Sequence, residues 1–220
     1  MPAAVVARSD AGPRRTQSER RTATQRLLLD ATVASILEVG YARTTTTDVC
    51  ARAGVSQGAL FKHYPTKQQL VAAAAAHLYD ELITGYVASL DVAPETVTIS
   101  RAIEVLGEIF RRPELAVAYE LQVAARTDPE LRRSLAPIVD RHAGNLRRQA
   151  AELFPDLAGH PRFDVLFDLV LESLQGLAVS RMVGPYQEHE SGVIALLVDL
   201  CSTTLEGPAE HASITTRRKR

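Results

Sequence analysis

The residues with the clearest capacity for chemistry lie between Thr44 and Lys67. The amide of Gln57 can form paired hydrogen bonds with adenine, and the methyl group of Ala59 can contact a thymine methyl. Gly58, between them, has no side chain to hold a double helix away from the backbone. These three residue types predict contact with base edges in a major groove.

Six neighbouring residues carry groups that suit a phosphate backbone, because hydroxyl, ammonium and imidazole groups bond phosphate oxygens without reading the base sequence. They are Thr46, Thr47, Lys62, His63, Tyr64 and Lys67. Thr47 is also placed to approach a base, and the ring of Tyr64 is expected to be partly buried. The alternative for each polar side chain is simple exposure to solvent.

Two short helices must position these residues, and the periodicity predicts them over Thr46 to Ala53 and Gln57 to Tyr64. The residues that bound them are Thr44 or Thr45 and Ser56 as N-caps, Gly54 as a left-handed C-cap and Pro65 as a terminator. Two helices joined by so tight a turn form a helix-turn-helix, which lays its second helix in the major groove.

Residues 54–58, Gly-Val-Ser-Gln-Gly, also satisfy G-x-S-x-G, the nucleophile motif of α/β-hydrolases. That motif requires a strand before the serine, whereas the preceding residues have a helical pattern. No phosphate-binding glycine loop, H-E-x-x-H or C-x-x-C motif occurs. We therefore predict no enzyme, no cofactor and no metal site, and we expect Cys50 and Cys201 to be buried free thiols.

The distribution of charge supports a nucleic-acid partner for one end of the chain, although the formal net charge is only −1. Residues 1–67 carry 10 Lys and Arg against 5 Asp and Glu, whereas residues 68–216 carry 11 against 21. A basic N-terminal part on an acidic remainder is expected when only one end meets a polyanion.

The fold class predicted for the chain is all-α with about nine helices, because apolar residues recur at helical spacing and no strand-like alternation is found. We expect a disordered basic arm over residues 1–21, a three-helix head over 22–82 with its motif at about 45–64, a body over 83–207 and a disordered tail over 208–220. Arg14, Arg15, Arg20 and Arg21 of the arm and Arg217 to Arg220 of the tail could touch DNA or remain solvated. A long helix from Lys67 is expected to connect head and body.

The body helices are predicted over Ile99–Arg112, from Pro113, over Pro129–Phe154, Pro161–Val183 and His189–Glu206. The last two are apolar enough to form either the core of one chain or a four-helix bundle between two chains. No apolar segment is long enough to span a bilayer, so we expect a cytoplasmic protein.

A ligand pocket in the body would be mostly apolar with a few placed polar groups. Five polar residues near apolar helix faces are therefore candidate pocket residues, with surface positions as the alternative. They are Tyr119, Gln122, Arg126, His142 and Gln175.

The segment from about Thr22 to Leu82 resembles the TetR family of bacterial transcriptional regulators. The resemblance rests on Gly40-Tyr41, Thr44-Thr45, Asp48-Val49, Ala53-Gly54-Val55-Ser56, Gly58, Leu60-Phe61, Tyr64 and Thr66-Lys67-Gln68-Gln69-Leu70. Two positions depart from the family's pattern. Phe61 stands where Tyr is common, which removes a phosphate-bonding hydroxyl, and Cys50 replaces a frequent Ala.

The resemblance implies a DNA-binding head, a ligand-binding and dimerisation body, and a homodimer that binds an inverted-repeat operator. It also implies that a small-molecule effector releases the DNA by changing the spacing of the two heads. A helical small-molecule-binding protein whose head contacts another protein is the alternative hypothesis. A helical enzyme is a third class, but no catalytic constellation favours it.

Overall fold

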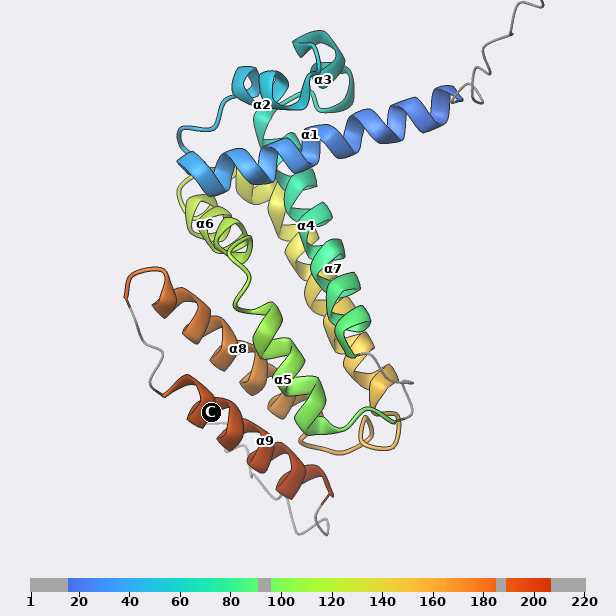
Figure 1. Cartoon of the computed structure of the whole chain (residues 1–220), viewed down its shortest axis with the longest axis vertical. Coiled ribbons are helices and arrows are strands. Elements are labelled where there is room, and N and C mark those ends of the chain that lie inside the picture. The colour runs from blue at the N-terminus through green and yellow to red at the C-terminus, as the bar shows by residue number, and fades with distance from the viewer. Residues whose placement is uncertain (1–15, 91–95, 185–188, 207–220) are drawn as a thin grey trace, which may run out of the picture.

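The computed structural model describes residues 16–90, 96–184 and 189–206. These ranges form nine helices and no strand, which confirms the all-α prediction (Figure 1). In chain order they are α1 Gln17–Val39, α2 Thr46–Ala53, α3 Gln57–His63, α4 Lys67–Leu90, α5 Ile99–Ile109, α6 Leu115–Ala125, α7 Pro129–Leu153, α8 Phe163–Arg181 and α9 Glu190–Glu206. Arg14, Arg15, the tail over 208–220 and most of the loop before α5 lie outside the described residues.

The head consists of α1, α2 and α3, with the start of α4 closing its core. Thr45 and Ser56 cap α2 and α3 through their hydroxyl groups, and Gly54 ends α2 with a φ of 65°. That φ lies in the left-handed region that side chains disfavour, so glycine suits the turn. Leu28, Val49, Leu60, Tyr64 and Leu70 fill the core between these helices.

Helix α1 begins at Gln17, five residues before the predicted start, so the predicted disorder is wrong for residues 17–21. The cause is a capping box that the sequence prediction missed. The hydroxyl of Thr16 accepts a hydrogen bond from the backbone of Glu19, whose carboxylate accepts one from the backbone of Thr16. As a result, Arg20 and Arg21 lie on a helix.

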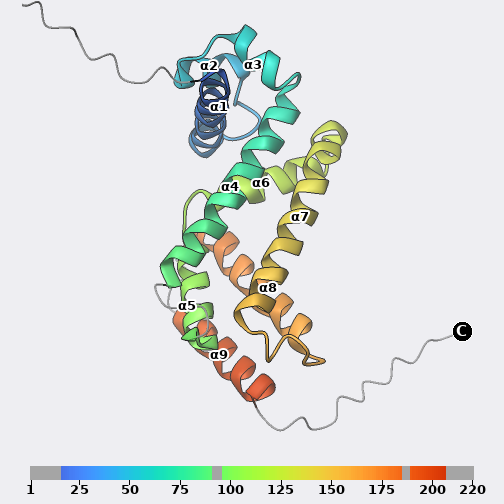
Figure 2. The ribbon, with the colours of Figure 1, turned by 90° about the vertical axis from the view of Figure 1, so that its right-hand side faces the viewer.

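The body is built around α4 and α7, which run side by side away from the head (Figures 1 and 2). Helix α4 passes through Gly85 without a break, and the predicted division at Leu82 falls inside it. Helix α6 of the body lies beneath α1, where Ile36 of α1 joins the core formed by α4, α6 and α7. A second core joins α5, α8 and α9. The head therefore rests on the body through shared packing rather than through a linker.

Some apolar residues of the last two helices are exposed, among them Val179 of α8 and Leu196 and Leu200 of α9. Their neighbours Ile194, Leu197 and Cys201 occupy the buried face of α9 instead. Periodicity identifies an apolar stripe but cannot determine how much of that stripe the same chain covers. Cys50 and Cys201 are buried free thiols, as predicted. Among the described residues, no helix has the length and apolarity needed to cross a bilayer.

Candidate nucleic-acid interface and internal cavity

The exposed face of the helix-turn-helix presents the residues predicted to read bases. Gln57 is exposed at the first position of α3, and its amide Nε2 donates a 2.7 Å hydrogen bond to Oγ1 of Thr47 on α2. This bond joins two side chains that the sequence assigned to the same surface. Gly58 follows on the same exposed turn, and Ala59 is half-buried.

The last turn of α3 supplies the basic groups of this surface. Lys62 is exposed, whereas His63 is half-buried and its Nδ1 has no hydrogen-bond partner among the described residues. Burial lowers the pKa of His63, and the nearby charges of Arg21 and Lys62 lower it further. Arg21 belongs to the helical first turns of α1. The imidazole of His63 is therefore neutral near pH 7 and can donate a hydrogen bond to a phosphate.

Two of the predicted phosphate contacts have competing roles inside the protein. Tyr64 is buried in the head core. The ammonium of Lys67 donates a 2.8 Å hydrogen bond to the carbonyl oxygen of Tyr41 and lies 4.4 Å from the centre of the Tyr41 ring. Burial lowers the pKa of Lys67. A phosphate bound by Lys67 would have to compete with these contacts, whereas Thr46 and Thr47 lie nearer the surface.

Tyr41 connects the head to the body, a role that sequence reasoning missed. Its hydroxyl donates a 2.8 Å hydrogen bond to Oδ2 of Asp128, and its backbone N–H bonds the carboxylate of Glu120. The other carboxylate oxygen of Asp128 caps α7 by accepting from the N–H groups of Glu130 and Leu131. These bonds join residues far apart in the chain, so no local pattern could have indicated them.

The adjacent Gly40 is constrained by both conformation and space. Its φ is 83°, and a Cβ at this position would lie 2.9 Å from Oε1 of Glu120. The turn that carries Tyr41 therefore requires glycine if Glu120 is to reach the backbone.

A cavity of about 140 Å³ lies in the body, among α4, α5, α7, α8 and α9 and the start of α6. Its wall is almost entirely apolar, formed by residues such as Leu82, Ile103, Phe154 and Leu166. It is the kind of concave, mostly apolar site that a small organic molecule occupies.

His142 is the one predicted pocket residue that lines this cavity. Its ring is stacked on that of Tyr79, with centroids 4.0 Å apart, and its Nδ1 has no hydrogen-bond partner in the described part of the chain. Burial lowers the pKa of His142 to about 4, so the imidazole is neutral near pH 7. An uncharged imidazole at an apolar wall can bond one polar atom of a ligand without requiring a counter-charge.

The other four pocket candidates lie elsewhere. Tyr119 is buried in the core that includes Tyr79, and no described residue bonds its hydroxyl. Gln122 is half-buried and donates a 3.4 Å hydrogen bond to the hydroxyl of Tyr79. Arg126 is exposed at the end of α6, and the half-buried Gln175 does not line the cavity. Tyr86 and Gln149, which do line it, were not predicted.

An all-α chain with a helix-turn-helix at one end and a separate helical body indicates a class of protein, the DNA-binding transcriptional regulators. Comparisons with known proteins identify the family. Residues 28–74 match the model described as "Bacterial regulatory proteins, tetR family". An HTH-type transcriptional regulator of Mycobacterium tuberculosis is 33% identical over 87% of this chain and 99% of its own length. CymR, an HTH-type transcriptional regulator of Pseudomonas putida, is 33% identical over 77% of this chain and 84% of its own length.

Solved structures agree with this match. A transcriptional regulator from a Rhodococcus species has a TM-score of 0.67 with 23% identity, over 81% of this chain and 96% of its own. The multidrug binding protein EbrR, solved with imidazole, has a TM-score of 0.58 with 25% identity, over 88% of this chain and 97% of its own. The chain therefore belongs to the TetR family of bacterial transcriptional regulators, and it is a DNA-binding regulator.

Proposed function

We propose that this protein is a repressor that binds an inverted-repeat operator as a homodimer and releases it when a small molecule enters the body. The observation that carries the proposal is the bonded pair of Gln57 and Thr47 on the exposed face of the helix-turn-helix, in the same chain as an apolar cavity. The cytoplasm is its proposed location, because a bacterial operator is found there.

The exposed apolar faces of α8 and α9 support dimerisation through these two helices. Leu196 and Leu200 lie one turn apart on α9, with 70% and 44% of their surface exposed. Val165 and Leu169 likewise lie one turn apart on α8, with 67% and 42% of their surface exposed. Two copies packed through these faces would form a four-helix bundle and remove the apolar side chains from water. A two-fold symmetric dimer would then present two heads to two half-sites.

Helices α4 and α7 both line the cavity and both reach the head, which suggests a path for the signal. Lys67, at the start of α4, bonds the backbone carbonyl of Tyr41, and Asp128, which caps α7, accepts a hydrogen bond from the Tyr41 hydroxyl. A molecule that enlarges the cavity would move these helix ends relative to each other. We expect the heads to change their spacing, so that the effector weakens operator binding by its differential affinity for the two states.

Fluorescence anisotropy with DNA from upstream of the protein's own gene tests operator recognition, with a scrambled fragment of equal length as the control. We expect binding that is much tighter for the upstream fragment and that weakens as salt rises. Lys62→Ala should weaken both fragments and reduce the salt slope by about one, because one phosphate contact is lost. Equal affinity for both fragments at every salt concentration would contradict operator recognition and favour the alternative of a protein-binding head.

Sedimentation analysis tests the dimer independently of DNA. The double change Leu196→Glu and Leu200→Glu should convert a dimer into a folded monomer, because four carboxylates would meet in the bundle. The control is Val123→Glu, which places one glutamate on α6, outside the proposed interface, at a residue 66% exposed. A dimer that survives the double change would contradict this interface.

The effector is proposed to be a small, mainly apolar molecule, because the described cavity wall carries no ionised group. The wall includes His142, whose Nδ1 has no hydrogen-bond partner among the described residues. The structurally similar EbrR is a multidrug binding protein, which is consistent with a body suited to such molecules. A thermal-shift screen should therefore favour neutral apolar compounds, and the compounds that stabilise the protein should also lower operator affinity. Stabilising compounds that leave the operator bound would contradict the proposed release.

A further inference from the structure

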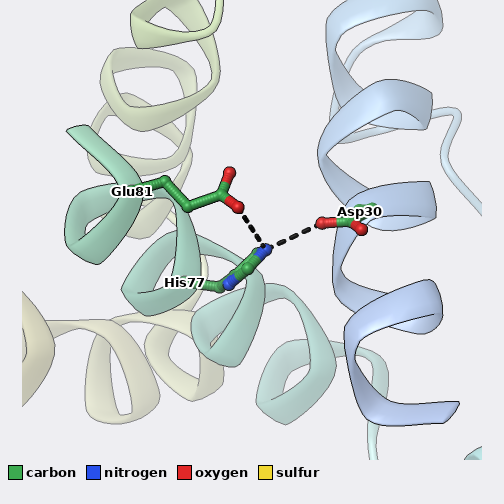
Figure 3. Close-up of side chains that lie close together, drawn as sticks. All are labelled: Asp30, His77 and Glu81. Carbon is green, nitrogen blue, oxygen red and sulfur yellow. Dashed lines mark hydrogen bonds and ion pairs between the residues drawn. The ribbon is translucent and has the colours of Figure 1, made fainter. Parts of the chain in front are cut away.

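Three side chains with metal-binding atoms converge where α1 of the head crosses α4. Figure 3 shows His77 and Glu81 projecting from α4 toward Asp30 on α1. The Nε2 atom of His77 lies 2.7 Å from Oδ1 of Asp30 and 3.4 Å from Oε1 of Glu81. All three ligand atoms lie within 4.8 Å of one another. One imidazole nitrogen therefore stands between two carboxylates supplied by different helices.

We propose that Asp30, His77 and Glu81 form a binding site for a divalent transition-metal ion such as Zn²⁺. Zinc binds His nitrogen and carboxylate oxygen at about 2.0–2.2 Å, so ligand atoms in a tetrahedral site lie about 3.3 Å apart. The two distances from His77 Nε2 bracket this value, and small side-chain rotations about a common centre would equalise them. One imidazole among the donors favours a transition metal over Mg²⁺ or Ca²⁺, which prefer oxygen ligands alone.

The two helices hold the three side chains near one another before an ion binds. His77 and Glu81 are four residues apart, so they lie on the same face of α4. His77 is the least exposed of the three, with 19% of its side chain accessible, against 49% for Asp30 and 44% for Glu81. The site faces an open groove between α1 and α4 that His77 and Glu81 help to line. An ion can therefore enter from solvent and keep a water molecule as its fourth ligand.

Arg26 is the competing cation at this site. Its guanidinium lies 3.3 Å from Oε1 of Glu81 and 3.9 Å from Oδ2 of Asp30. The side chain is 68% exposed, so it can swing into solvent when an ion binds. Without metal the four residues form a surface ion-pair network, which contributes little to stability. With metal, α1 and α4 become cross-linked at the junction of head and body.

Titration of the EDTA-treated, dialysed full-length protein with Zn²⁺ by calorimetry tests the site, and Co²⁺ gives an absorption spectrum that reports its coordination. We expect one ion per chain and a cobalt spectrum typical of nitrogen and oxygen ligands in a four- or five-coordinate site. His77→Gln and Glu81→Gln should each weaken binding by about 100-fold or more, because even loss of an outer-shell partner costs 10- to 100-fold. Circular dichroism establishes that each variant is folded.

Two further variants separate coordination from general electrostatics. Asp80→Asn removes a carboxylate from the same groove that is not part of the three-residue cluster, and it should change affinity only severalfold. Arg26→Gln should tighten binding, because a competing cation is lost. The proposal is wrong if the wild type binds neither ion, or if His77→Gln and Glu81→Gln bind as the wild type does. These measurements involve no DNA, so they stand or fall independently of the proposed repressor function.

Discussion

The head and the body place their functional polar groups in opposite surroundings. In the head, Gln57, Thr47 and Lys62 are exposed on two short helices that are adjacent in the chain. In the body, the free nitrogen of His142 is buried at a cavity wall to which six helices contribute. A surface that must bind a hydrated polyanion keeps its charges in water, whereas a site for a small apolar molecule excludes water. The two regions should therefore respond to different kinds of mutation.

The largest expected difference concerns whether the core of the head unfolds together with the body. Leu60→Ala, at a fully buried residue of the head, should reduce the free energy of unfolding by about 2–5 kcal/mol. Because the head core is small and packs on the body mainly through α1 and α4, we expect the loss to concentrate in α2 and α3. Hydrogen exchange should show lost protection there and little change in α8 and α9. DNA binding should fail while the dimer persists.

The matched control is Leu121→Ala, which removes the same atoms from a fully buried residue of the body core. It should lower protection around α4, α6 and α7 instead. If both variants reduced protection evenly along the chain, the head and the body would be one cooperative unit and the comparison would not hold.

Replacing Gln57 should change the base preference of DNA binding but leave the stability of the fold unchanged. Gln57→Ala should cost about 1–3 kcal/mol in binding the preferred operator and little in binding random DNA. Anisotropy titrations with both DNAs give this difference, and a melting curve checks that the fold is unchanged. Gln69→Ala is the control, because Gln69 is an exposed glutamine on α4, outside the helix-turn-helix. If Gln69→Ala relaxed base preference as much, α3 would not be the reading helix.

The burial of His142 predicts a pH dependence that the exposed groups of the head do not share. Its pKa falls from 6.5 unfolded to about 4 folded, so between these values the unfolded chain binds the additional proton. Stability contributed by neutral His142 is thus present above pH 6.5 and is lost as the pH falls toward 4.

His142→Phe retains a ring against Tyr79 and cannot titrate. Between pH 7 and pH 5 the wild type should lose about 1–2 kcal/mol more unfolding free energy than this variant, measured by urea denaturation. Other buried groups cancel in the comparison, including His63, whose pKa is also lowered. Equal losses in the two proteins would mean that His142 is hydrated in the folded state.

The same contrast explains which features could be predicted from the sequence. The bounds of α2 agree with the prediction, and those of α3 differ only at Tyr64, because Thr45, Gly54 and Ser56 act on the residues next to them. The start of α1 was missed only because the Thr16 and Glu19 pair was overlooked, although it is equally local. Side-chain contacts of the head with DNA remain predictions.

Features of the body depend on contacts between distant residues, and here sequence reasoning was weaker. Tyr119 and His142 have similar local patterns, yet only His142 lines the cavity, because the crossing of α4, α6 and α7 decides which side each faces. The exposure of Leu196 could not be predicted either, because an apolar stripe does not reveal whether its partner is the same chain or another. Asp30 and His77 are separated by 47 positions, so no spacing rule applies to their meeting.

The smallest predicted effect comes from adding a single Cβ atom at Gly58, which should change protein stability and DNA affinity in opposite directions. Gly58 lies in α3 with an ordinary helical φ, and a Cβ there would have no described protein atom within 4 Å. Gly58→Ala should therefore stabilise the protein by about 0.5–1 kcal/mol, since alanine favours a helix. It should nevertheless weaken operator binding if DNA approaches this backbone.

Gly144→Ala is the matched control, because Gly144 lies in α7 with equal free space and far from the helix-turn-helix. It should give the same gain in melting temperature with no loss of DNA affinity. If Gly58→Ala stabilised the protein and bound the operator as tightly as the wild type, this turn of α3 would not lie against DNA. Gln57 would then read bases from a distance that excludes a close backbone contact.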